Sequence, residues 1–135
     1  MKKTIIAALA VMIAASGTAP ALAKPKLTGE AKLAKMLEGR EAGKPVSCLP
    51  LGSGSDTTVI DKTAIVYRYG NTLYVNRPTN ANALDSDDVM VTELRGSSTL
   101  CRLDTVKLHD RASHFYEGFV GLQDFVPYRK IASAR

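Results

Sequence analysis

The first regular pattern of apolar and polar positions, in EAKLAKMLEGREA, is helical. Its apolar residues recur at the three- and four-residue spacing of one helical face: Leu33, Met36 and Leu37. Thr28 is a suitable N-cap, and Gly43 followed by Pro45 is a typical stop. The pattern therefore predicts one N-terminal amphipathic helix over about 28–42, which packs on a sheet or, in a sharper interpretation, docks onto a partner.

After the helix the pattern changes to short runs rich in β-branched and aromatic residues, separated by turn residues. This spacing predicts a mainly β domain, a small antiparallel β-barrel or sandwich, with strands over about 45–128. The later strands are expected at 89–94, 100–103, 116–122 and 125–128. Pro127 has no N–H, so we expect it at an edge strand or at the end of a strand. Residues 129–135 are expected to form a loose tail.

The clearest β signal is a hairpin in TAIVYRYGNTLYVNR. Gly70 begins a two-residue turn of type II′, in which glycine takes a positive φ. The register then places Val66 opposite Val75 and Tyr67 opposite Tyr74. One face of the hairpin carries Ala64, Val66, Leu73 and Val75, and the other carries Ile65, Tyr67, Tyr69, Thr72, Tyr74 and Asn76.

The second of these faces is a candidate binding face, formed by Tyr67, Tyr69, Tyr74 and Asn76. Each tyrosine combines a flat apolar ring with a hydroxyl group, which suits a binding platform. The alternative, which we favour, is cross-strand packing of the tyrosines in a half-buried sheet.

A change of parity marks the region after the second cysteine. Cys101 and Leu103 share one face of a strand, whereas Val106 and Leu108 have the opposite parity. A bulge or break near residues 104–105 would place all four side chains in one core.

The first 23 residues have the three parts of a secretory signal peptide. Lys2 and Lys3 precede an apolar run over 4–15, and Ala-Leu-Ala ends the segment. The run is shorter than the ~20 residues that cross a bilayer. We therefore expect cleavage between Ala23 and Lys24, and a mature chain of 112 of the 135 residues without a transmembrane segment.

Charge and length change this picture little. The chain has 18 basic and 13 acidic residues, a net charge of +5, and loss of Lys2 and Lys3 leaves 16 against 13, or +3. The basic residues do not form a stripe with interleaved aromatic residues, so no nucleic-acid binding is expected. A chain of this length can bury one core, and residues 24–135 are expected to form a single β-rich domain.

Two cysteines are present, Cys48 and Cys101, and an exported chain can join them in one disulfide. The bond would close a loop of 53 residues and stabilise the domain by about 4 kcal/mol. A nucleophilic role is less favourable, because Leu100 and Leu103 give Cys101 an apolar environment that disfavours the thiolate. A zinc site formed by both cysteines with His109 and His114 is also disfavoured, since structural zinc sites usually use close pairs of cysteines and these two are far apart in the sequence.

No common catalytic motif is present: the chain lacks G-x-S-x-G, H-E-x-x-H and the dinucleotide fingerprint. Four residues remain as candidates for a small hydrolase: Asp104, His109, Asp110 and His114. His109 and Asp110 are adjacent, and neighbours in a strand point to opposite faces, so they form no dyad. We expect a protein that is not an enzyme and has no cofactor.

The polar segment 77–88 is expected to be a long loop. It offers oxygen ligands for calcium: Asn80, Asn82, Asp85, Asp87 and Asp88. The spacing does not match an EF-hand, which favours turn formation over metal binding. Residues 80–88 are also the candidate contact loop if the protein inhibits a secreted hydrolase.

Five stretches carry a resemblance: EAKLAKMLEGREAGKPVSCLP, GNTLYVNRP, LDSDDVMVTELRG, LCRLDTVKL and GFVGLQDFVPYRK. Over nearly the whole mature chain, the sequence resembles short exported proteins of alphaproteobacteria that have no characterised activity. The resemblance implies a single domain in a Gram-negative envelope, hence the periplasm, with the extracellular space as the alternative. It brings no catalytic or binding residues.

From these observations we expect a non-enzymatic module that binds a protein or an envelope component. The alternative is an inhibitor of a secreted protease or lysozyme, because small rigid domains can present a preorganised loop.

Overall fold

A computed structural model describes residues 24–52, 55–94 and 98–132 of the chain. The elements are α1 (Gly29–Met36), β1 (Arg40–Ala42), β2 (Cys48–Pro50), β3 (Asp56–Ile60), β4 (Ala64–Tyr69), β5 (Thr72–Asn76), η1 (Ala81–Ala83), β6 (Asp88–Thr92), β7 (Thr99–Cys101), β8 (Thr105–Asp110), β9 (Tyr116–Gly121) and β10 (Phe125–Lys130). The predicted fold class is confirmed: mainly β, with antiparallel sheets and one short N-terminal helix. The expected signal peptide, with Ala23, lies outside the described residues, and Lys24 is the first described residue. No helix in the described part is long and apolar enough to cross a membrane.

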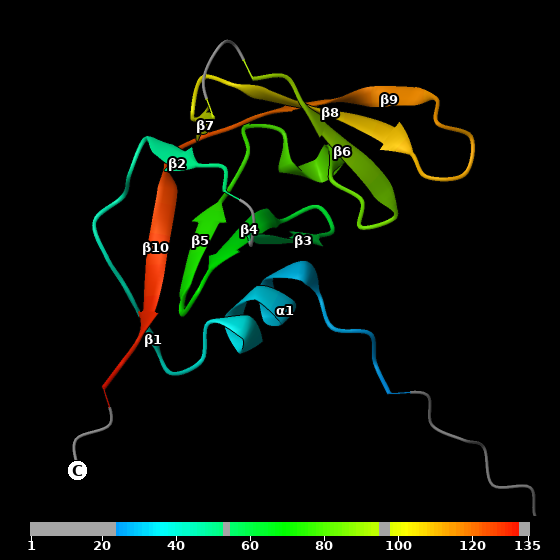
Figure 1. The fold of residues 1–135 in the computed structure, drawn as a ribbon. Coiled ribbons are helices and arrows are strands. Elements are labelled where there is room, and N and C mark those ends of the chain that lie inside the picture. The colour runs from blue at the N-terminus through cyan, green and yellow to red at the C-terminus, as the bar shows by residue number, and fades with distance from the viewer. Residues whose placement is uncertain (1–23, 53–54, 95–97, 133–135) are drawn as a thin grey trace, which may run out of the picture.

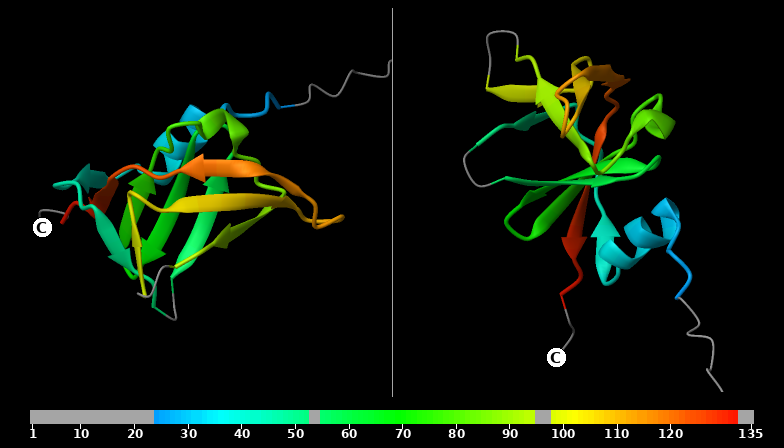
Figure 2. Two further views of the ribbon diagram at one scale, coloured as in Figure 1. Left: turned by 90° about the horizontal axis from the view of Figure 1, so that it is seen from above. Right: turned by 90° about the vertical axis from the view of Figure 1, so that its right-hand side faces the viewer.

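The strands form three antiparallel sheets. The largest has the order β1-β10-β5-β4-β3, the second has the order β6-β8-β9, and β2 pairs with β7. Helix α1 covers one face of the five-stranded sheet, and the smaller sheets cover the other face (Figure 1, Figure 2). The domain therefore has three layers, and both faces of its central sheet are covered.

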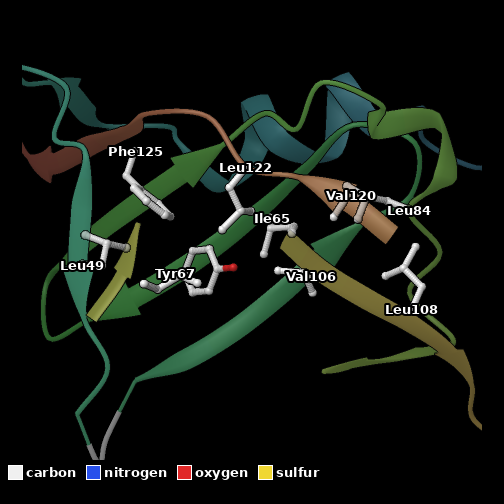
Figure 3. Packing of buried hydrophobic residues seen from close by; sticks show 10 residues of the cluster. Leu49, Ile65, Tyr67, Leu84, Val106, Leu108, Val120, Leu122 and Phe125 are labelled. Atoms are coloured by element: carbon white, nitrogen blue, oxygen red, sulfur yellow. The ribbon is translucent and has the colours of Figure 1, made fainter. Parts of the chain in front are cut away.

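The two faces of the central sheet contribute to two separate cores. The core on the helix side contains Leu33, Ile60, Ala64, Val66, Leu73 and Val75. The core on the other side contains Leu49, Ile65, Tyr67, Leu84, Leu100, Val106, Leu108, Val120, Leu122 and Phe125 (Figure 3). Because side chains alternate along a strand, β4 supplies residues to both cores, and for this reason its sequence is apolar at consecutive positions.

The predicted hairpin register is confirmed. Val66 lies opposite Val75, and Tyr67 lies opposite Tyr74. Gly70 has a φ of 54°, the positive value that the first central residue of a type II′ turn requires. The two faces expected from this register are the faces observed, one in each core.

Helix α1 begins as predicted and ends earlier than predicted. The Thr28 hydroxyl accepts a hydrogen bond of 3.2 Å from a backbone N–H of the first turn, as expected for an N-cap. The helix stops at Met36, well before residue 42, because Gly39 takes a φ of 68°, in the left-handed region. Arg40–Ala42, expected in the helix, form β1 at the edge of the sheet.

Strand β10 corrects two expectations about the C-terminal part. Arg129 and Lys130, expected in a loose tail, are strand residues paired with β1. Pro127, expected at an edge or a strand end, lies within an inner strand, between β1 and β5 in the sheet. The pairing with β1 begins only at Tyr128, and beyond it the Pro127 carbonyl accepts a hydrogen bond of 2.7 Å from Gly43 N–H, a contact that needs no N–H of Pro127.

The chain forms a turn between β7 and β8. The Asp104 carboxylate accepts a hydrogen bond of 2.7 Å from Cys101 N–H, and the Asp104 N–H donates to the Cys101 carbonyl at 2.9 Å. The expected break is therefore present, and Val106 and Leu108 enter the core. The expectation that all four side chains share this core is wrong, because Leu103 is 88% exposed at the turn and Cys101 is only half-buried.

Candidate functional site

A cleft of about 420 Å³ opens between β3 and β6. β3 is the last strand of the five-stranded sheet, and β6 is the last strand of the three-stranded sheet. No pairing joins these two edges, so within the described residues the sheets form no closed barrel. The cleft is lined by Leu51, Thr57, Val59, Tyr67, Ser86, Asp88, Val89, Met90, Thr92, Leu100 and Arg111.

Backbone groups of β3 face this cleft. In a two-residue hairpin the residues that flank the turn exchange both backbone hydrogen bonds, and such pairs alternate along antiparallel strands. Alternate residues of β4 therefore bond to β5, and the others, Val66 among them, bond to β3. Because Thr58 lies opposite Val66, the N–H and C=O groups of Thr57 and Val59 point away from β4.

Strand β6 presents the same kind of edge from the other side of the cleft. The N–H and C=O of Gly121 bond to the segment before η1, which fixes the phase of the hydrogen bonds between β9 and β8. The alternation leaves the backbone groups of Met90 and Thr92 directed away from β8. The Asp88 carbonyl is in the same phase and accepts a hydrogen bond of 3.4 Å from the Arg111 guanidinium. In the described part of the chain, no further strand pairs with β3 or β6 on this side.

Tyr67 lies at the bottom of the cleft and is only 4% exposed. Its ring packs edge-on against Phe125, with 5.7 Å between the ring centroids (Figure 3). Burial, and to a smaller extent the neighbouring Tyr69, raises the pKa of Tyr67 well above its ordinary value. The Tyr67 hydroxyl therefore stays protonated at physiological pH.

The structure places the four residues of the predicted binding face inside the domain. Tyr67 and Asn76 are buried, and Tyr69 and Tyr74 are half-buried with their rings edge-on at 5.7 Å. The Asn76 side chain donates to the Gln123 carbonyl at 2.6 Å and accepts from the Gln123 N–H at 3.2 Å, so both amide atoms are engaged. The shared face agrees with cross-strand packing, and of the four residues Tyr67 lines the cleft.

Acidic side chains gather at one end of the cleft. Asp88 lies opposite Asp110 on the neighbouring strand, and Glu117 of β9 is close enough for the two carboxyl groups to affect each other's pKa. Burial, together with Asp85, raises the pKa of Asp88, and the charge of Asp88 raises the pKa of Glu117. The Arg111 guanidinium donates to two backbone carbonyls here. This end of the cleft therefore has an excess of carboxyl groups.

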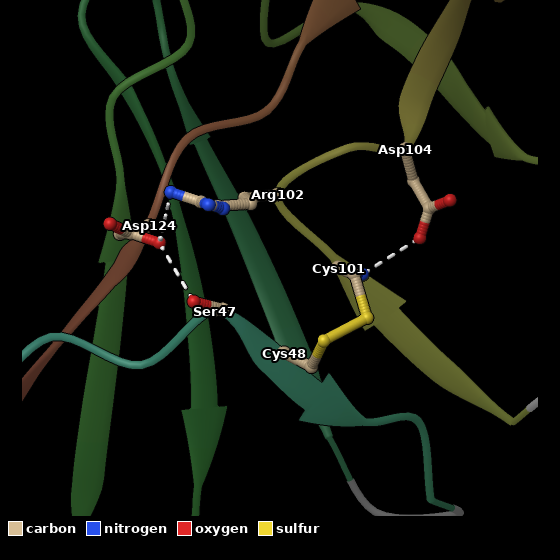
Figure 4. The surroundings of a disulfide bond; sticks show 6 residues. All are labelled: Ser47, Cys48, Cys101, Arg102, Asp104 and Asp124. Atoms are coloured by element: carbon tan, nitrogen blue, oxygen red, sulfur yellow. Dashed lines mark hydrogen bonds and ion pairs between the residues drawn. A yellow bond between two sulfur atoms is a disulfide. The ribbon is translucent and has the colours of Figure 1, made fainter.

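The disulfide holds the wall at the other end of the cleft. Cys48 and Cys101 lie directly opposite each other in β2 and β7, with their Cα atoms 4.0 Å apart (Figure 4). The adjacent pair is Leu49 and Leu100, and Leu100 lines the cleft. The predicted disulfide is confirmed, and neither cysteine is available as a nucleophile or a zinc ligand while the bond is intact.

Three of the four hydrolase candidates have side chains that contact polar groups of neighbouring turns. The Asp104 carboxylate accepts a backbone N–H in the turn after β7, and the Asp110 carboxylate accepts both the N–H and the hydroxyl of Ser113. His109 Nδ1 lies 3.2 Å from the His114 carbonyl. Asp104 and Asp110 are at opposite ends of β8, and none of the four side chains lines the cleft.

The segment with the candidate calcium ligands contains η1 and several internal hydrogen bonds. Asn80 uses both atoms of its side-chain amide to bond the backbone of β9, at 2.6 and 3.1 Å. Asp85 Oδ1 accepts a hydrogen bond of 2.9 Å from Asp87 N–H. Across 24–52, 55–94 and 98–132, no three His, Cys, Asp or Glu side chains are grouped to hold a metal ion.

Sequence reasoning missed the residues at the edges of the cleft: Thr57, Val59, Met90 and Thr92. Their signal is weak, because they are exposed or half-buried and so are not marked as core positions in a short strand. The cleft itself depends on which strands end the two sheets, and long-range pairing decides this. Comparison of the chain with known protein families, with curated proteins and with solved structures found no match.

Proposed function

We propose that the protein is a non-enzymatic binding module of the periplasm and that it binds another protein, or an envelope component, in the cleft between β3 and β6. The observation that carries this proposal is the position of the cleft between two strand edges that have no partner strand among the described residues. An open edge is a template for pairing with another chain. Three of the four hydrolase candidates, Asp104, His109 and Asp110, contact polar groups of neighbouring turns, and none of the four lines the cleft, which favours binding over catalysis.

The proposed compartment has two supports. The first 23 residues have the parts of a secretory signal peptide, and a disulfide persists in oxidising compartments such as the periplasm. Intact-mass analysis of protein recovered from the periplasm tests both. We expect a chain that begins at Lys24 and lacks two hydrogens relative to its dithiol form. An uncleaved chain in the cytosol would contradict the proposed localisation.

The binding site is tested with two neighbouring threonines of β3. Both are exposed, but Thr57 points into the cleft and Thr58 points to the opposite face of the sheet. Thr57→Arg places a long cation in the cleft, and Thr58→Arg adds the same charge outside it. The oxidised domain (24–135) and both variants are immobilised and exposed to envelope extract of an alphaproteobacterium.

We expect the wild-type domain and Thr58→Arg to retain the same partner, and Thr57→Arg to lose it. Circular dichroism establishes first that all three proteins are folded. Equal retention by the two variants would show that the cleft is not the binding site.

The alternative function, inhibition of a secreted hydrolase, is favoured by how the 80–88 loop is held. Asn80 anchors its start to β9, and the Ser86 N–H donates to the Asp61 carboxylate at 2.7 Å. The exposed residues between them, such as Asp85, are thus fixed before any partner binds, which lowers the entropic cost of binding. The hydrolysis rates of a panel of proteases and lysozymes are measured with and without micromolar concentrations of the domain. Rates that stay unchanged for every enzyme would rule out this alternative.

A further inference from the structure

We propose that the partner of this cleft is an extended polypeptide segment, which adds to the edge of β3 as a sixth strand of the central sheet. The inference rests on the proposed function, because it specifies what the cleft binds. It goes further in assigning the contact to backbone groups of this chain, those of Thr57 and Val59.

The arrangement of polar groups on this edge points to a polypeptide. Thr57 and Val59 each direct one N–H and one C=O away from β4, at the two-residue repeat of a strand. A second extended backbone offers donors and acceptors with the same repeat. Binding in this way is a general mode of peptide recognition, in which main-chain hydrogen bonds give affinity and pockets for alternate side chains give specificity.

The wall of the cleft suits the alternate side chains of such a strand. Side chains of Leu51, Tyr67, Met90 and Leu100 line it. Alternate residues of the added strand point toward these side chains, and the residues between them point to the helix side of the sheet. The partner segment is therefore expected to have apolar residues at every second position.

Charge determines the expected composition of one end of the segment. The Ile60 end of β3 leads to Asp61, whose carboxylate accepts a hydrogen bond from the Ser86 N–H at the border of the cleft and forms an ion pair with Lys32 at 3.7 Å. Asp88 and the carboxyl groups around it lie on this side as well. A lysine or arginine in the partner, beyond the residue that pairs with Val59, would meet this negative charge.

A second copy of the chain is a different occupant of the same edge. The cleft residues come from both β3 and β6, so the occupant lies between two strands. A single chain segment is slender enough for such a position, whereas the edge of a second folded sheet has further strands and side chains behind it. We therefore assign the site to an extended segment of another protein.

The test uses a phage-displayed library of random heptapeptides. The library is selected on the oxidised domain (24–135) and depleted on Thr57→Arg. The affinity of the enriched peptide is then measured for wild type, Thr57→Pro and Thr57→Val. Proline removes the outward N–H, which makes no bond within the sheet, and valine removes the hydroxyl but keeps the N–H.

We expect Thr57→Pro to weaken peptide binding at least fivefold, the equivalent of one backbone hydrogen bond of about 1 kcal/mol. Thr57→Val should stay within twofold of wild type. A second measurement is independent of how well the proline variant folds: the peptide is N-methylated at alternate amides. Methyl groups in one phase should abolish binding, and methyl groups in the other phase should be tolerated.

The outcomes separate this inference from the proposed function. One outcome is a peptide that does not bind Thr57→Arg, binds Thr57→Pro and Thr57→Val equally and tolerates N-methylation in either phase. This result would overturn strand addition and leave the cleft as a binding site. Absence of any enriched peptide would overturn both. A wild-type dimer that Thr57→Arg converts to a monomer would assign the edge to a second copy of the chain.

Discussion

Replacing both cysteines with alanine tests how much the disulfide stabilises the domain. Cys48 is exposed and Cys101 is half-buried, so Cys48→Ala with Cys101→Ala removes little packing. The main change is the loss of the covalent link. The experiment therefore isolates the effect of the cross-link on the unfolded chain.

The magnitude follows from the length of the loop that the bond closes. The two cysteines are 53 residues apart, and the chain-entropy relation gives about 4 kcal/mol for a loop of this length. Small domains have unfolding free energies of about 5–15 kcal/mol. The double variant is thus expected to lose a large share of its stability, although its cores are unchanged.

The assay is urea unfolding followed by far-ultraviolet circular dichroism, since the chain has no tryptophan. Oxidised wild type, reduced wild type and the double variant are compared at one pH. We expect the last two to have similar unfolding free energies, about 4 kcal/mol below the first. A loss under about 1 kcal/mol in both would refute the loop-closure reasoning.

Two further variants test the close packing at the start of α1 and the effect of the carboxyl groups around Asp88 on stability. A Cβ at Gly29 would lie 1.9 Å from Thr63 Oγ1, so Gly29→Ala should lower the unfolding free energy measured in urea by about 1–3 kcal/mol. Gly52→Ala is the control, because a Cβ at Gly52 would meet no atom within 4 Å, and it should have little effect. Equal losses of stability in the two variants would show that Gly29 is not crowded. The pKa values of Asp88 and Glu117 are higher in the folded protein than in the unfolded chain, so the ionised carboxyl groups destabilise the folded state at neutral pH. This destabilisation disappears at low pH, where both groups are protonated. Glu117→Gln should therefore have a higher melting temperature than wild type at pH 7 and the same melting temperature at pH 3. A lower melting temperature than wild type at pH 7 would show that the Glu117 charge does not destabilise the fold.

The sequence was sufficient to predict the central hairpin in detail. A two-residue turn at Gly70 fixes the pairing of every residue on the two strands, so Val66 and Val75 follow from local chemistry alone. The disulfide was predictable for a similar reason, because two cysteines allow one intramolecular pair.

The remaining features depend on contacts between distant segments. Arg40–Ala42 are a strand only because β10 lies beside them, and a three-residue strand has no periodicity that distinguishes it from the end of a helix. The burial of Tyr67 and Asn76 depends on two smaller sheets that cover the hairpin. Across 24–52, 55–94 and 98–132, β3 has a partner strand on one side only, and no local sequence pattern indicates this.

Amide hydrogen exchange by NMR tests the central claim, that the edge of β3 is open and accepts a strand, most directly. In the free domain the Thr58 N–H, bonded to β4, should exchange slowly, and the amides of Thr57 and Val59 should exchange fast. Saturation with the selected peptide should slow exchange at Thr57 and Val59 at least tenfold and leave Thr58 nearly unchanged. Slow exchange at all three amides in the free domain, or no change at Thr57 and Val59 on binding, would contradict the account.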